Sequence, residues 1–233
     1  MYRMSYNRKQ SLNDKGLSMP VLFTQAWDII QGKESDYAEF IVRTYMPEMQ
    51  AIGLTPVGGY YVEVGFGPRI IAVHRASDLE ELSRRISAER FKELTLKVKS
   101  LIYNYRTALL EPTGAVKKEE YTIQRGVWKF NQYYDLRPGL KKEYADFVMN
   151  EYIPALSQVD YFEITGGWNV VLGGISEIIG EFTFKDPVDI GRLLNNEDFR
   201  RLNLKLKNEL VVNYQSRILR CTERFDEPRW FRL

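Results

Sequence analysis

The chain has 233 residues, and its 33 basic and 31 acidic side chains leave a formal net charge of only +2, so no overall field favours binding to nucleic acid. Its one cysteine, Cys221, excludes an internal disulfide framework, and its one histidine argues against a zinc or non-haem iron centre. The composition therefore predicts a protein of a reducing compartment, the cytoplasm, without a metal site.

The N-terminal stretch, residues 1–19, is polar and basic and has neither helical nor strand periodicity. We expect an arm that is flexible or that packs against the body of the protein. It lacks the apolar core of a signal peptide. Apolar runs elsewhere are interrupted every few residues by charge or glycine, so the sequence predicts a soluble protein with no membrane partner.

From Phe23 onward, the sequence recurs 107 to 109 positions later. Matching residues include Phe23 with Phe130, Gln25 with Gln132, Tyr45 with Tyr152, Gly58-Gly59 with Gly166-Gly167, and Asn104-Tyr105 with Asn213-Tyr214. A period of about one small domain indicates tandem duplication. We predict a first repeat over 20–113, a linker over 114–125, a second repeat over 126–225 and a C-terminal tail over 226–233.

The first repeat changes its apolar period several times. Residues 21–30 are rich in β-formers, and the apolar residues between 37 and 45 then fall at helical spacing. Glycines bound a strand over 58–65, and a strand over 69–75 completes a hairpin. Asp78 with Glu81 has the spacing of a helix N-cap, and a long helix is expected to follow it, before a fourth strand over 104–110.

The second repeat predicts the same order of elements. They are a strand over 127–136, a helix over 144–152, strands over 166–173 and 177–184, a long helix after Asp186 and a strand over 213–221. This order is the split βαβ arrangement, in which two helices cover one face of a four-stranded antiparallel sheet. The predicted fold class is α+β, with two tandem ferredoxin-like βαββαβ repeats.

A ferredoxin-like repeat leaves one face of its sheet uncovered, and two such faces bury each other when they pack together. The segments Tyr134–Tyr144 and Asn213–Leu219 resemble the first strand, turn and helix and the closing strand of NIPSNAP-like proteins, which belong to the dimeric α/β-barrel superfamily. The resemblance implies that one chain supplies both halves of an intramolecular α/β barrel. Such a barrel is expected as a monomer or as a homodimer.

His74 and Glu63 are the candidate catalytic residues. His74 lies in a predicted central strand, where the second repeat has Phe182. It is either a structural histidine or a group that points into the barrel as a base, a hydrogen-bonding partner or a haem ligand. Glu63 corresponds to Val171, and a duplicated protein would place a single active site at such an asymmetry, although drift on a solvent-exposed face gives the same difference.

Amide and aromatic residues are the candidate ligand-binding groups. Alternation places Gln25 and Trp27 on one face of the first strand, and Gln132 and Tyr134 are their equivalents in the second repeat. With Tyr61 of the hairpin, they suit a small-molecule pocket between sheet and helices. A packed core explains them as well if each buried glutamine finds partners, which the two glutamines would provide by facing each other.

The sequence is compatible with three functions, and it does not decide whether the protein is an enzyme. The first is small-molecule binding or cofactor-independent catalysis of oxygenase or isomerase type. The second is a non-catalytic scaffold with a packed barrel whose helices bind a partner. The third is haem binding, because chlorite-dismutase-like enzymes of the same superfamily are also tandem ferredoxin-like chains, although their ligand motif is not recognisable here.

Overall fold

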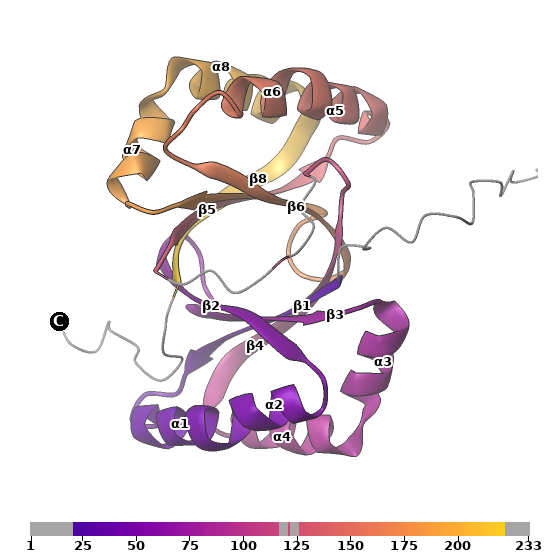
Figure 1. Ribbon diagram of the computed structural model, residues 1–233, viewed down its shortest axis with the longest axis vertical. Coiled ribbons are helices and arrows are strands. Elements are labelled where there is room, and N and C mark those ends of the chain that lie inside the picture. Colours follow the sequence, from indigo (N-terminus) through magenta and orange to yellow (C-terminus); the bar gives the residue numbers. More distant parts are fainter. Residues whose placement is uncertain (1–20, 117–120, 122–125, 222–233) are drawn as a thin grey trace, which may run out of the picture.

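The computed structural model of the chain describes residues 21–116, 121 and 126–221. The predicted N-terminal arm and the predicted tail over 226–233 lie outside these residues, as does most of the predicted linker over 114–125. The described residues contain almost all of both predicted repeats, which Figure 1 shows stacked one above the other.

Both repeats have the predicted βαββαβ order. The elements of the first are β1 (Val21–Ile29), α1 (Glu34–Phe40), the π-helical turn η1 (Ile41–Tyr45), α2 (Met46–Ala51), β2 (Thr55–Val64), β3 (Ile70–Ala76), α3 (Leu79–Ser87), α4 (Glu89–Lys99) and β4 (Ile102–Pro112). Those of the second are β5 (Trp128–Leu136), α5 (Lys141–Phe147), η2 (Val148–Tyr152), α6 (Ile153–Leu156), β6 (Glu163–Gly173), β7 (Ile178–Phe184), α7 (Val188–Asn195), α8 (Glu197–Lys205), η3 (Leu206–Leu210) and β8 (Val211–Cys221). No helix in the described ranges is long and apolar enough to cross a membrane.

The long helix predicted late in each repeat is broken into two. Ala88 between α3 and α4 and Asn196 between α7 and α8 have extended backbone angles, with ψ of 141° and 128°. The Asn196 side chain accepts a hydrogen bond from the Phe199 amide and so caps the start of α8. The apolar stripe continues across both breaks, so the periodicity of the sequence does not predict them.

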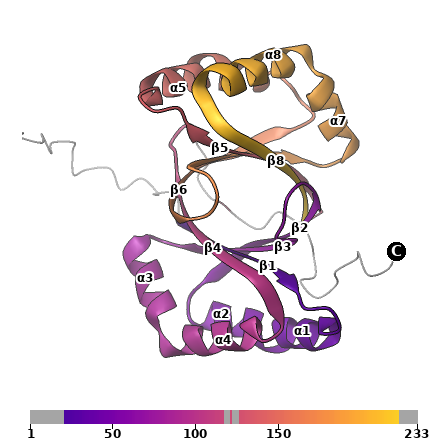
Figure 2. The same cartoon turned by 180° about the vertical axis from the view of Figure 1, so that it is seen from behind.

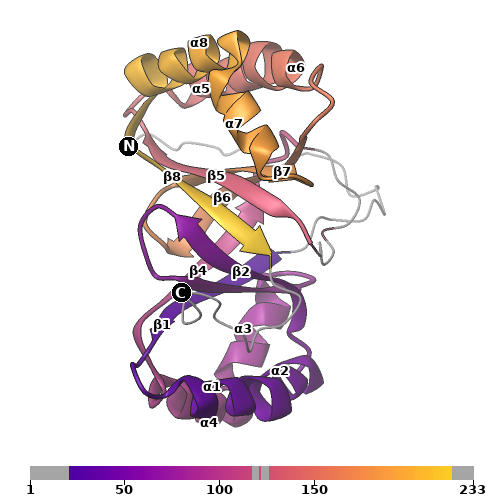
Figure 3. The same ribbon diagram turned by 90° about the vertical axis from the view of Figure 1, so that its left-hand side faces the viewer.

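The eight strands form one closed barrel in the order β1-β3-β2-β8-β5-β7-β6-β4. The repeats join along two antiparallel seams. In the first, β2 lies beside β8, with Val62 opposite Leu219 (Figure 3). In the second, β4 lies beside β6, with Pro112 opposite Trp168 (Figure 2). The helices cover the outside at opposite ends of the molecule (Figure 1), so the predicted intramolecular α/β barrel is confirmed.

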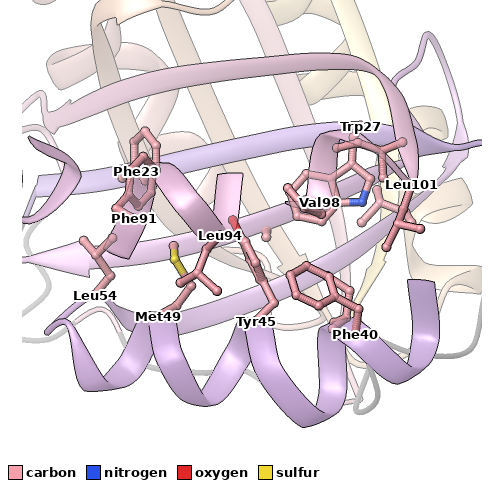
Figure 4. Packing of buried hydrophobic residues seen from close by; sticks show 14 of the residues in the cluster. Phe23, Trp27, Phe40, Tyr45, Met49, Leu54, Phe91, Leu94, Val98 and Leu101 are labelled. Carbon is pink, nitrogen blue, oxygen red and sulfur yellow. The ribbon is translucent and has the colours of Figure 1, made fainter. Parts of the chain in front are cut away.

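Strand alternation divides the buried residues into three cores. One core in each repeat lies between sheet and helices, and Figure 4 shows Phe23, Trp27 and Tyr45 in that of the first repeat. The third core fills the barrel and draws on both repeats, with Leu22, Tyr60, Val73, Leu110, Trp168 and Leu219 among its members. Each sheet thus buries an inner face that it would expose to water on its own.

Two asparagines give a physical reason for part of the repeated sequence. Asn104 and Asn213 have positive φ angles of 55° and 54°, a left-handed conformation that asparagine adopts more readily than most residues. Their side chains donate to Asp28 and Asp135, at 3.1 and 2.8 Å. The pairings of β1 with β4 and of β5 with β8 shift register beside these residues, so each Asp–Asn pair stabilises the bulge there.

Because the inner faces bury each other, neither repeat should fold alone as a monomer. We expect the fragments 20–113 and 126–225, produced separately, to lack a cooperative thermal transition, since each exposes its inner face to water. Mixing them should restore the transition in a one-to-one complex. Circular dichroism and size-exclusion chromatography measure both properties, and a monomeric fragment that unfolds cooperatively would contradict the expectation.

Candidate functional site

The predicted ligand-binding residues all lie on helix-covered faces, in two separate groups. Gln25, Trp27 and Tyr61 are buried in the first repeat, and Gln132 and Tyr134 are buried in the second. The barrel core lies between the two groups, so the five residues do not form a single site. They form two versions of one arrangement.

In the first repeat this arrangement is closed. The Tyr45 hydroxyl donates to Gln25 Oε1 at 3.0 Å, and Gln25 Nε2 donates to the Tyr105 hydroxyl at 2.7 Å. Trp27 Nε1 donates to the Tyr37 hydroxyl at 3.0 Å, and both rings are buried. The glutamine is therefore satisfied by tyrosines of its own repeat, and the expectation that the two glutamines face each other is wrong.

In the second repeat the same layer contains a cavity of about 510 Å³, between β5, β6 and β7 on one side and α5, η2 and α6 on the other. Gln132 accepts a hydrogen bond from the Tyr152 hydroxyl and donates one to Asn203 Oδ1, both at 3.2 Å. The Tyr134 and Tyr144 hydroxyls lie 2.9 Å apart. The volume is within the range of about 300–1,000 Å³ that is typical of small-molecule sites.

Four replacements between the repeats account for the cavity. By the internal repeat, Trp27, Ile41, Tyr61 and Ala72 correspond to the smaller residues Tyr134, Val148, Asn169 and Gly180. All four first-repeat residues are at most 2% exposed, whereas their counterparts line the cavity. Loss of side-chain volume from a packed layer leaves space when the backbone does not collapse. Asn169 is exposed, so the cavity reaches the surface beside it.

The tyrosines of the cavity are hydrogen-bond donors at neutral pH. Burial raises the pKa of Tyr134, Tyr144 and Tyr152 above the ordinary value near 10. Burial also raises the pKa of the neighbouring Tyr214 to about 12. The bond between the Tyr134 and Tyr144 hydroxyls uses one of their two protons. The other proton is available for an acceptor atom of a ligand.

No protein-family model matches the chain, and no curated protein sequence matches it. Solved structures do match it. An anthrone oxidase-like protein has a TM-score of 0.62 at 12% identity, over 87% of this chain and 91% of its own. A chlorite dismutase variant from Candidatus Nitrospira defluvii has a TM-score of 0.57 at 8% identity, over 87% and 91%. The chain therefore has the dimeric α/β-barrel fold. A NIPSNAP family protein from Agrobacterium tumefaciens covers 41% of the chain at 16% identity, with a TM-score of 0.34 and 94% of its own length matched.

The two candidate catalytic residues of this α/β barrel are not brought together. His74 lies opposite Phe23 where β1 pairs with β3, on the helix-covered face, so the alternative in which it points into the barrel is wrong. It is fully buried, and neither ring nitrogen has a partner among the described residues. Glu63 lies near the far end of β2 and accepts a hydrogen bond from Arg220 at 2.5 Å. Neither residue lines the cavity, and their catalytic roles stay predictions.

The described lining of the cavity offers no imidazole or thiolate to a haem iron. Haem iron in proteins takes an imidazole, thiolate, thioether or tyrosinate ligand. The single histidine lies in the other repeat, and the tyrosines of the cavity are held protonated by burial. The thioether of the lining belongs to Met149, which is half exposed on the outer helix. Among the described residues, no three His, Cys, Asp or Glu side chains gather where they would hold a metal ion.

The barrel interior holds a charged cluster that our sequence analysis did not predict. Lys129 Nζ lies 2.6 Å from Glu181 Oε1, and both side chains are buried. The Tyr121 hydroxyl accepts from Lys129 at 2.8 Å and lies 2.9 Å from Glu181 Oε2. Lys129 and Glu181 correspond to Leu22 and Val73 of the first repeat. This replacement of apolar by charged residues is visible in the aligned repeats and is the signal that would have found the cluster.

His74 should make stability depend on pH. Burial lowers the pKa of His74 from 6.5 to about 4, so between these values the unfolded chain binds a proton that the folded protein does not. Stability gained from the neutral imidazole is therefore lost as the pH falls through this window. Between pH 7 and pH 4.5, we expect the wild type to lose about 2 kcal/mol more than His74→Phe, which copies Phe182. Urea unfolding at the two pH values measures this, and equal losses in both proteins would contradict it.

Proposed function

We propose that this protein binds a small, largely apolar molecule in the cavity between the sheet and the helices of the second repeat. The observation that carries the proposal is the difference between the repeats. Trp27 and Tyr61 fill the layer in the first repeat, and the same layer is open in the second. A protein with a purely structural role would gain stability from filling both layers, because close packing of a core is stabilising.

The lining indicates the chemistry of the ligand. Apolar side chains of Ile164, Ile178 and Phe182 form much of the sheet side, which suits a planar aromatic or aliphatic ring. The tyrosine pair of Tyr134 and Tyr144 supplies a hydroxyl donor. A ligand that carries a carbonyl or hydroxyl oxygen would accept this hydrogen bond while its ring occupies the apolar part.

The residues support binding more directly than catalysis. Proton abstraction needs a base that is unprotonated near neutral pH, and the tyrosines of the cavity are protonated. Glu181 borders the cavity, but its carboxylate is bound by Lys129 and Tyr121 of the barrel interior. Among the described residues that line the cavity, we therefore assign no base for a reaction of oxygenase or isomerase type, and ligand binding is the function that we propose.

Titration with anthrone and with 2-naphthol tests the proposal. Anthrone is chosen because a protein of similar fold is described as anthrone oxidase-like, and naphthalene serves as the oxygen-free comparison for 2-naphthol. We expect saturable binding by isothermal titration calorimetry, with 2-naphthol about fivefold tighter than naphthalene, since one hydrogen bond contributes about 1 kcal/mol. Failure of both oxygenated probes to bind would favour the scaffold function instead.

A variant whose cavity is filled by larger side chains tests where the ligand binds. Asn169→Tyr with Gly180→Ala copies the first repeat into the cavity. A Cβ at Gly180 would lie 3.6 Å from Gln132 Oε1 and 3.8 Å from the Tyr134 hydroxyl, which is ordinary contact, so the fold should tolerate the change. We expect binding at least tenfold weaker, with a Tm equal to or above that of the wild type.

The matched control for the filled variant is Ala72→Gly, the reverse change at the equivalent position of the first repeat. It should leave ligand affinity unchanged, because the residue lies in the closed layer. A filled variant that binds as tightly as the wild type would place the ligand elsewhere and contradict the proposed site.

A further inference from the structure

A second, smaller cavity lies inside the barrel, where no function has been assigned. Its volume is about 90 Å³, and its lining includes Pro68 and Ser176 from the hairpin turns at one end of the barrel. A water molecule occupies about 30 Å³ in the liquid. The cavity therefore has room for a molecule of roughly three to five non-hydrogen atoms.

A buried arginine without a carboxylate partner lines this cavity. Arg217 of β8 is 6% exposed, and no ion pair links it to a carboxylate of the described residues. Its Nη2 donates to the Gly67 carbonyl at 2.9 Å, and its guanidinium lies 3.7 Å from the centroid of the Phe66 ring. Nε is buried and has no partner among the described residues. A buried charge normally has a counter-charge, so this one requires an explanation.

The turn between β2 and β3 holds Arg217 in place. Gly65 has a φ of 115°, and a Cβ there would lie 2.7 Å from the Ser216 carbonyl oxygen. Glycine thus allows the turn to press against β8, which brings Phe66 and Gly67 onto the guanidinium. The run Gly65-Phe66-Gly67-Pro68 is the turn between β2 and β3, and its Pro68 lines the cavity.

An unpartnered acceptor faces the same space. Asn131 of β5 lies directly opposite Arg217 where β5 pairs with β8. It is 7% exposed, lines the cavity, and its Oδ1 is buried without a partner among the described residues. Buried polar atoms are almost always hydrogen-bonded in native proteins. A donor on one strand and an acceptor on the next, both without partners, indicate a polar occupant between them.

The charge around the cavity is positive. The Glu181 carboxylate is already compensated by Lys129 at 2.6 Å. Arg106 lines the cavity as well, and burial together with the charges of Arg106 and Arg69 lowers the pKa of Arg217. The positive charge of the arginines that no carboxylate of the cavity compensates favours the binding of an anion. The buried charge of Arg217 has no counterpart in the first repeat, where Ala108 takes its place.

We propose that the barrel cavity binds a short-chain carboxylate of up to about five non-hydrogen atoms. The guanidinium of Arg217 holds the carboxylate, because its planar set of donors matches two carboxylate oxygens. In a hydroxy acid such as glycolate, the hydroxyl donates to Asn131 Oδ1. This site is independent of the function proposed for the larger cavity.

Calorimetric titration of the full chain with glycolate and with acetate tests the site, with sodium chloride at equal ionic strength as the control. We expect saturable binding of both, tighter for glycolate, and at least tenfold weaker binding in Arg217→Gln. Arg220→Gln is the matched control, since it removes a positive charge from the same strand where the side chain pairs with Glu63 instead. Equal binding in the two variants, or an equal response to chloride, would overturn the proposal.

Two further measurements keep the proposal testable if Arg217→Gln does not fold. In the wild type, the ¹⁵N-detected Nε–H signal of Arg217 should shift when glycolate is added and should reach saturation. Asn131→Ala should remove the preference for glycolate over acetate and retain acetate binding. An unmoved Nε–H signal at saturating glycolate would overturn the proposal, as would an unchanged preference in Asn131→Ala.

Discussion

The pairing of β2 with β8 and of β4 with β6 is the constraint on which the rest of the structure depends. It joins two sheets, each with one bare face, into a barrel whose interior belongs to both repeats. Because one chain supplies both sheets, the two inner faces need not be alike. Lys129 and Glu181 occupy inner positions where the first repeat has Leu22 and Val73. A symmetric dimer of identical chains cannot contain such a difference.

Duplication made the fold predictable from the sequence, because residues that the backbone requires recur at one spacing. The left-handed asparagines Asn104 and Asn213 are the clearest case. Alternation also grouped the side chains of each strand correctly. Alternation did not decide which face the helices cover. A period of two residues separates the two faces of a strand but does not tell which face packs against helices. The sequence therefore left open whether His74 points into the barrel, and the structure places it on the helix-covered face with Phe23.

The candidate site was predictable only in part. Gln132 and Tyr134 stand out by residue type and spacing, and both line the larger cavity. The cavity itself depends on volume lost at positions as distant as Val148 and Gly180, and only the packed structure sums such losses. The barrel cluster of Lys129 and Glu181 was within reach, since comparing the repeats position by position shows where charge has replaced apolar residues.

Strand β7 separates the barrel cavity from the larger cavity beneath the helices. Its Gly180 lines the cavity beneath the helices, and the carboxylate of the next residue, Glu181, pairs with Lys129 in the barrel interior. A ligand in either cavity would therefore contact residues of the same strand. Any change that one ligand causes in the affinity for the other must be mutual and equal in both directions. The two cavities thus share one wall, and that wall belongs to the second repeat.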